Sequence, residues 1–101
     1  MAGVLLSSVA ERDLADIWDY IARDNPDAAD RLLCQIDTQA RFYGVNPGLG
    51  TPYTELFRGL RSFAVGEYVG FYLPFAEGIR IVRILHRARD LPKVFAVNDG
   101  R

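Results

Sequence analysis

Cysteine, histidine and lysine are scarce in this chain of 101 residues, since each occurs once, as Cys34, His86 and Lys93. A single cysteine excludes an internal disulfide framework, and one cysteine with one histidine does not give the ligand spacing of a zinc site. Cys34 falls inside a helical pattern, where we expect a small, buried apolar thiol. Because lysine is nearly missing, arginine carries almost all of the positive charge.

Long apolar runs are missing as well. No run approaches the roughly 20 residues of a membrane-spanning helix, and the N-terminus has no basic segment followed by a long apolar stretch. P-loop and dinucleotide-binding glycine motifs are also missing. The composition, with 50% hydrophobic and 25% charged residues, is that of an ordinary globular protein. We expect one domain, residues 1–101, in the cytoplasm, with no cofactor, no metal and no membrane contact.

Charges of opposite sign lie in different halves of the chain. Residues 1–57 hold four arginines against nine acidic residues, a balance of −5. Residues 58–101 hold eight basic residues against four acidic ones, a balance of +4. The formal net charge of −1 therefore hides a bipolar molecule. Such an asymmetry predicts that the basic half faces an anionic partner.

A strand and a helix are predicted first. The short apolar run at residues 4–6 is typical of a β-strand. Ser8 and Glu11 have the spacing of a capping box, so a helix should begin there. It should continue for about four turns, because apolar residues recur at helical spacing as far as Ile21. The tripeptide at residues 24–26 should end it.

A second helix is predicted directly afterwards, so that the two helices form an antiparallel hairpin. Asn25 fits the N-cap, Pro26 the first helical position and Asp27 the first turn. The residues Asn46-Pro47-Gly48 should end this helix. Its predicted apolar stripe comprises Ala29, Leu32, Leu33, Ile36, Ala40 and Tyr43. Trp18, Tyr20 and Tyr43 are expected to pack in the core or between the helices.

The second half of the chain predicts a sheet. Residues 46–58 are rich in proline, glycine and threonine and read as an ordered loop. Pro74 suits the end of a strand rather than its middle. The predicted strands are residues 61–65, 68–73 and 79–85, the last with alternating side chains, and the turns lie at 66–67 and 76–78. The order β-α-α-β-β-β predicts an α+β fold, with the helical hairpin on one face of a small, mainly antiparallel sheet and the other face partly free.

A cluster of cationic residues surrounds the histidine near the end of this sheet. Arginine binds phosphate and carboxylate groups in a bidentate manner and stays charged at any relevant pH. Three interpretations remain open: a solvated charged face, a nucleic-acid surface interleaved with aromatic rings, and a groove for an acidic protein segment. The candidate binding residues are Arg58, Arg61, Arg83, His86, Arg87 and Arg89.

His86 has two interpretations of its own. Neighbouring arginines favour the neutral imidazole, which would suit a general base. A lone histidine at the end of a strand is more often a hydrogen-bonded structural residue.

Four segments together resemble the ParE branch of the RelE/ParE toxin superfamily over nearly the whole chain. They are LSSVAERDLADIWDYIARDNPDAADRLLCQI, NPGLGTPYTEL, GLRSFAVGEYVGFY and IVRILHRARD. The resemblance implies the same β-α-α-β-β-β fold. It also implies the toxin of a type II toxin–antitoxin module, held in a tight hetero-oligomeric complex by a ParD-like antitoxin. The implied activity of ParE-like toxins is inhibition of DNA gyrase, whereas RelE-like toxins cleave mRNA in the ribosome.

Departures from the RelE-like pattern favour gyrase. RelE-like nucleases place lysines on the first strand of the C-terminal hairpin, an arginine on the next strand, and a tyrosine or a histidine–tyrosine pair near the C-terminus. At the matching places this chain has Ser62, Ala64, Val69, Gly70, Val94 and Phe95. We therefore expect a gyrase inhibitor that is not itself an enzyme, with ribosome-dependent RNA cleavage as the alternative. For that alternative, the resemblance to nuclease relatives that use a histidine makes Arg83, His86 and Arg89 the catalytic candidates. The chain has no helix-turn-helix, so sequence-specific DNA binding is not expected.

Overall fold

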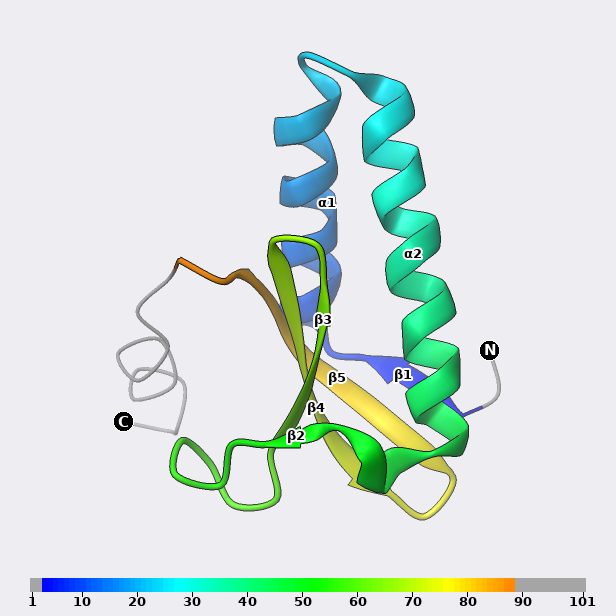
Figure 1. Cartoon of the computed structure of the whole chain (residues 1–101), viewed down its shortest axis with the longest axis vertical. Helices are drawn as coiled ribbons and strands as arrows, with labels where there is room; N and C mark the ends of the chain where they lie inside the picture. The colour runs from blue at the N-terminus through cyan, green and yellow to red at the C-terminus, as the bar shows by residue number, and fades with distance from the viewer. Residues whose placement is uncertain (1–2, 89–101) are drawn as a thin grey trace.

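Two helices stand side by side against one face of a five-stranded sheet (Figure 1). The computed structural model describes residues 3–88. The strands lie in the order β1-β5-β4-β3-β2, with β1 parallel to β5 and the other neighbours antiparallel. The elements are β1 (Val4–Leu6), α1 (Ser8–Ala22), α2 (Pro26–Val45), the 3-10 helix η1 (Pro47–Leu49), β2 (Thr51–Pro52), β3 (Arg61–Val65), β4 (Tyr68–Phe75) and β5 (Gly78–His86). The predicted α+β class and element order are confirmed.

The N-cap of α1 lies one residue before the predicted capping box. Ser7, rather than Ser8, is the cap, and its hydroxyl oxygen accepts a hydrogen bond from the Ala10 N–H at 3.0 Å. The same hydroxyl donates to the Val82 carbonyl oxygen at 3.0 Å. The Ser7 N–H donates to the Ile81 carbonyl oxygen at 2.9 Å. The prediction was one residue off because Ser7 both continues the pairing with β5 and begins the helix.

The second helix begins where the sequence predicts. The Asn25 side-chain oxygen accepts from the Ala28 N–H at 3.0 Å, and Pro26 is the first helical residue. Ala29, Ile36 and Ala40 are buried along the predicted stripe. Cys34, however, is exposed, so the expected buried thiol was wrong. Two residues correspond to about 200° around a helix, which turns Cys34 away from the side on which Ile36 is buried.

Two of the three helical aromatic residues pack as predicted. The Tyr43 ring stacks on Phe63, with centroids 5.3 Å apart, and so joins α2 to the sheet. The Trp18 indole donates to the Asp30 carboxylate at 2.9 Å and so joins α1 to α2. Tyr20 does not pack in the core, because its side chain is 70% exposed. No helix within residues 3–88 is long and apolar enough to cross a membrane.

The segment after α2 holds more structure than the predicted loop, because it contains η1 and the short strand β2. Tyr72 of β4 is fully buried beneath it. The Tyr72 hydroxyl donates to the Pro47 carbonyl oxygen at 2.7 Å and accepts from the Gly50 N–H at 3.0 Å. A Cβ at residue 50 would overlap this hydroxyl. One tyrosine thus fixes both ends of η1.

Replacing Tyr72 with phenylalanine is expected to lower the free energy of unfolding by about 1–3 kcal/mol, because a partly buried carbonyl and a buried N–H lose their partner. Urea unfolding followed by circular dichroism measures the change. The control is Tyr20→Phe, which removes an exposed hydroxyl and should cost no more than about 0.5 kcal/mol. Equal losses in the two variants would contradict the anchoring role of Tyr72.

Alkaline pH should destabilise the fold through two tyrosines. Burial raises the pKa of Tyr72 and of Tyr68 above the ordinary value of 10.0. Above pH 10 the unfolded chain loses these protons more readily than the folded chain does, so the free energy of unfolding falls as the pH rises. Denaturation profiles between pH 9 and about pH 11.5 should show this fall, and it should be shallower in Tyr72→Phe. An unchanged slope in the variant would contradict the assignment to Tyr72.

Candidate partner-binding surface

The sheet face opposite the helices is only partly covered. A loop of residues 53–60 folds back over it, and Leu60 of this loop is buried together with Phe71 and Leu85 of the sheet. Half-buried apolar side chains surround them, namely Tyr53, Leu56, Val69, Leu73 and Val82. We name this side of the sheet the open face. The prediction that one face stays partly free is therefore confirmed, although the covering loop was not foreseen.

The open face carries two cavities. The first, of about 320 Å³, is lined by Ser7, Val9, Phe57, Leu60, Leu73, Arg80, Val82 and Arg83. The second, of about 350 Å³, is lined by Thr51, Tyr53, Ser62, Ala64, Val69 and Arg87. The first combines mainly apolar walls with two arginines, and the second combines polar and apolar side chains with one arginine. Such a face suits a partner that presents apolar and anionic groups together.

A β-bulge decides which side chains of β5 reach the open face. Tyr72 pairs with Ile81 while Phe71 pairs with Arg83, so Val82 is an extra residue in β5. Val82 and Arg83 both line the first cavity. Beyond the bulge the alternation is inverted, because a bulge shifts the side-chain period by one residue. The uninterrupted alternation predicted for residues 79–85 was therefore wrong.

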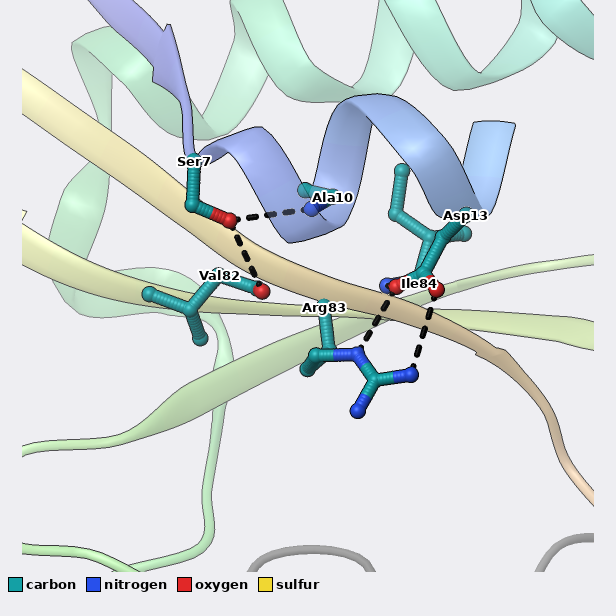
Figure 2. Close-up of polar contacts among 6 residues, drawn as sticks. All are labelled: Ser7, Ala10, Asp13, Val82, Arg83 and Ile84. Atoms are coloured by element: carbon teal, nitrogen blue, oxygen red, sulfur yellow. Dashed lines mark hydrogen bonds and ion pairs between the residues drawn. The ribbon is translucent and has the colours of Figure 1, made fainter. Parts of the chain in front are cut away.

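Arg83 is held by an acid on α1 (Figure 2). Its Nε and one terminal nitrogen donate to the two Asp13 carboxylate oxygens at 2.9 and 3.1 Å. The Ile84 N–H donates to the same carboxylate at 2.9 Å. The two ionic side chains are only 16% and 13% exposed. The strand β1 pairs only with residues 79–81 of β5. Beyond it, Ser7 binds the Val82 carbonyl oxygen and Asp13 binds the Ile84 N–H.

His86 lies on the other face of the sheet from Arg83. Its ring makes an edge contact with Tyr68, at a centroid distance of 5.3 Å, and Tyr68 packs against the core beneath the helices. The His86 Nδ1 accepts a hydrogen bond from the Ala88 N–H at 3.1 Å. Burial, and then the nearby Tyr20, raise the pKa of Tyr68. Arg83 and His86 therefore contact different partners, Asp13 and Tyr68.

The remaining candidate arginines differ in whether their guanidinium group has a hydrogen-bond partner, and we call those without one among residues 3–88 free arginines. Arg61 donates to the Gly50 carbonyl oxygen at 2.7 Å and so supports the loop after η1. Among residues 3–88, the guanidinium groups of Arg58 and Arg87 have no hydrogen-bond or ion-pair partner, and both residues are exposed. Arg87 lines the second cavity, and Arg58 lies in the loop over the open face. Arg89 lies outside the described residues.

Sequence reasoning missed Arg80 and Asp13. Arg80 is exposed and lines the first cavity, and the alternation of β5 from Gly78 to Ile81 was a signal for its outward position. Asp13 lies 70 residues from Arg83 in sequence, so no local pattern links the two. Among the described residues, no group of three histidine, cysteine or acidic side chains is placed to hold a metal ion.

A larger apolar groove, of about 700 Å³, lies at the β1 edge between the two helices and the sheet. Leu5 and Leu6 of β1 are among its exposed walls, and Glu11 and Asp37 give it an acidic rim. It is lined by Val4, Leu5, Leu6, Glu11, Leu14, Leu33, Cys34, Ile36, Asp37, Ala40 and Ile81. The exposed apolar walls mark a second candidate interface.

Comparisons with known proteins agree on one family. Residues 4–91 match the family described as ParE toxin of type II toxin–antitoxin system, parDE. The chain is 34% identical over 88 residues to Toxin ParE1 of Caulobacter vibrioides, covering 84% of this chain and 88% of that protein. Its fold matches a solved structure of a chromosomal ParDE toxin–antitoxin system from P. aeruginosa, with a TM-score of 0.68 and 23% identity, over 82% of this chain and 92% of that one.

Proposed function

The chain belongs to the ParE toxins of type II toxin–antitoxin systems, and from this premise we propose that it inhibits DNA gyrase and is neutralised by a ParD-like antitoxin. Gyrase inhibition is the activity that the resemblance to ParE toxins implies. It places the protein in the cytoplasm, together with gyrase and its DNA. The proposal assigns the free arginines of the open face to recognition rather than to bond cleavage.

The separation of Arg83 from His86 is the observation that carries this proposal. Cleavage of RNA needs a base or an acid and a cationic group aimed at the same phosphate. Here Arg83 turns to the open face and holds Asp13, whereas His86 turns to Tyr68 on the helical side. The Arg83 guanidinium is engaged by Asp13 and the His86 ring by Tyr68, so the two side chains are held by different partners and not aimed together at one phosphate. This arrangement favours gyrase inhibition over the RelE-like alternative.

The antitoxin has two surfaces to use. The groove at the β1 edge exposes Leu5 and Leu6, which an amphipathic helix or an added strand would bury. The open face presents free arginines, which suit an acidic segment. A ParD-like segment that wraps around the toxin would cover both and so bind tightly.

A supercoiling assay tests the proposal. The full chain, released from its antitoxin, is titrated into DNA gyrase with relaxed plasmid and ATP. The expected result is loss of supercoiling or accumulation of cleaved plasmid, reversed by added antitoxin. Unaffected gyrase, with a chain that still arrests growth on induction, would overturn the proposal in favour of ribosome-dependent RNA cleavage. A chain that arrests nothing would overturn both activities.

Replacing His86 with alanine should change gyrase inhibition by less than about threefold, because a structural histidine at a strand end contributes little to recognition. Replacing Arg61 or Arg83 with alanine should instead weaken inhibition by degrees, about three- to tenfold each. Half-inhibitory concentrations in the supercoiling assay measure both effects. Complete loss of growth arrest in His86→Ala, with antitoxin binding intact, would contradict the proposal and indicate a nuclease.

A further inference from the structure

The first cavity of the open face combines an apolar hollow with two arginines. Phe57 and Val9 line it and are each 45% exposed. Leu60, Leu73 and Val82 also line it and belong to the apolar cluster of the open face. Apolar side chains that surround a cavity and remain open to water mark a place where another molecule packs.

Arg83 presents a donor group to this cavity that its ion pair leaves unused. Its Nε and one terminal nitrogen bind the Asp13 carboxylate at 2.9 and 3.1 Å. The other terminal nitrogen has no partner among residues 3–88, and Figure 2 shows it on the side of the guanidinium group away from Asp13. Because the pair already orders this side chain, a ligand that binds it loses little additional rotamer entropy.

Arg80 adds a cation that no described acid neutralises. The residue is exposed, and among residues 3–88 its guanidinium group makes no hydrogen bond or ion pair. No described residue that lines the cavity is acidic, and Asp13 balances only the charge of Arg83. A carboxylate bound here would therefore accept hydrogen bonds from Arg80 and from the unused nitrogen of Arg83.

The pairing of β1 with β5 extends this site to the edge of the sheet. Leu5 pairs with Arg80, and paired residues of neighbouring strands project to the same face. Leu5 is 55% exposed and also lines the larger groove at the β1 edge. A segment that crosses the edge at Leu5 therefore meets both the groove and the first cavity.

We propose that the first cavity binds an acidic, apolar segment of a protein partner, with an apolar side chain between Val9 and Phe57 and a carboxylate on Arg80. A phosphate backbone would satisfy the arginines, but it has no apolar group to fill the space between Val9 and Phe57. A second copy of this chain fits less well, because its own acidic apolar surface, at the β1 edge, is a groove and does not project into a cavity.

The inference rests on the proposed function for the identity of this partner, the ParD-like antitoxin. The first cavity lies on the face to which we assign gyrase recognition. An antitoxin segment bound there would cover part of that face, so neutralisation would occur by direct exclusion of gyrase.

NMR spectroscopy of the full chain tests the site with synthetic peptides. The probe is the acetylated, amidated peptide LFEE, which carries apolar side chains next to two carboxylates. Its matched peptides are LFKK, with the opposite charge, and AAEE, without large apolar side chains. LFEE should shift the backbone amide signals of Val9, Arg80 and Val82, with a dissociation constant on the order of 1 mM. The two matched peptides should bind about tenfold more weakly.

Two pairs of variants assign the binding to the cavity. Arg80→Glu should weaken the binding of LFEE about tenfold, whereas Arg31→Glu, at an exposed position on α2, should change it less than about twofold. Phe57→Ser should also weaken binding about tenfold, because the peptide loses an apolar wall. Phe42→Ser is its control, since Phe42 is 47% exposed and lies on α2.

LFEE that shifts none of these signals at about 10 mM would overturn the proposal. Equal binding of LFEE and LFKK, or equal losses in Arg80→Glu and Arg31→Glu, would overturn it as well. A thymidine oligonucleotide that binds the same residues more tightly than LFEE would assign the cavity to nucleic acid instead. Signals that shift with protein concentration alone would indicate a second copy. None of these readouts depends on gyrase, so binding of LFEE by a chain that leaves gyrase unaffected would sustain the site and overturn only the proposed function.

Discussion

Replacing Asp13 with alanine is expected to lower the free energy of unfolding by about 3–5 kcal/mol, because it leaves a largely buried Arg83 cation without its partner. The same change removes the acceptor of the Ile84 N–H, which β1 does not replace. Domains of this size have a total stability of roughly 5–15 kcal/mol. The variant should therefore be close to the limit of folding. Urea unfolding, followed by the fluorescence of Trp18, measures the loss.

Asp37→Ala is the matched control for this loss. Asp37 also pairs with an arginine, Arg41, but the two side chains are 40% and 64% exposed. An exposed pair contributes at most about 1 kcal/mol, so this variant should be nearly as stable as the native protein. Asp13→Asn keeps an acceptor for the Ile84 N–H while it removes the charge, and should lie between the two. Similar losses in Asp13→Ala and Asp37→Ala would contradict the role assigned to the buried pair.

The Asp13 variants also separate folding from recognition at Arg83. Arg83→Ala changes both the surface of the first cavity and the stability of the β5 edge. Asp13→Asn weakens the pair but keeps the guanidinium group. If the two variants lose gyrase inhibition in parallel with their stability, Arg83 acts by supporting the fold. If only Arg83→Ala loses inhibition, its guanidinium group contacts the target.

Local patterns were sufficient to predict most of the fold. The helix stop at residues 24–26, the N-cap at Asn25 and the three long strands depend on residues close together in sequence, and the structure confirms them. The parallel pairing of β1 with β5 joins residues about 75 positions apart, and nothing local specifies it. No local pattern predicts the role of the Tyr72 hydroxyl either, because it binds the loop after α2 from 22 to 25 residues away.

The candidate site was harder to predict, because one inserted residue decides its geometry. Without the bulge at Val82, strict alternation from Ile79 would place Arg83 beneath the helices. The bulge instead turns Arg83 to the open face and His86 to the helical face. Whether Val82 is an extra residue depends on its pairing with β4 and on the Ser7 hydroxyl that binds its carbonyl. The sequence of β5 alone does not contain that information.

Free arginines on the open face lead to the prediction with the largest functional effect. Replacing Arg58 and Arg87 together with glutamate should raise the half-inhibitory concentration against gyrase on the order of a hundredfold, or about 2.7 kcal/mol. Both groups are exposed and have no partner within residues 3–88, so the change should leave the fold intact. It replaces attraction for an anionic target by repulsion, and the effect should shrink as salt screens the charges.

Arg12→Glu with Arg23→Glu is the control for this change. These two arginines are also exposed, but they lie on α1 and at its C-terminal end, in the acidic half of the molecule. The control alters the net charge by the same amount at a different place. If recognition resides on the open face, the control should change inhibition only a few-fold, because long-range attraction alone depends weakly on position. Equal losses in the two double variants would mean that gyrase responds to net charge, and the open face would then lose its assigned role.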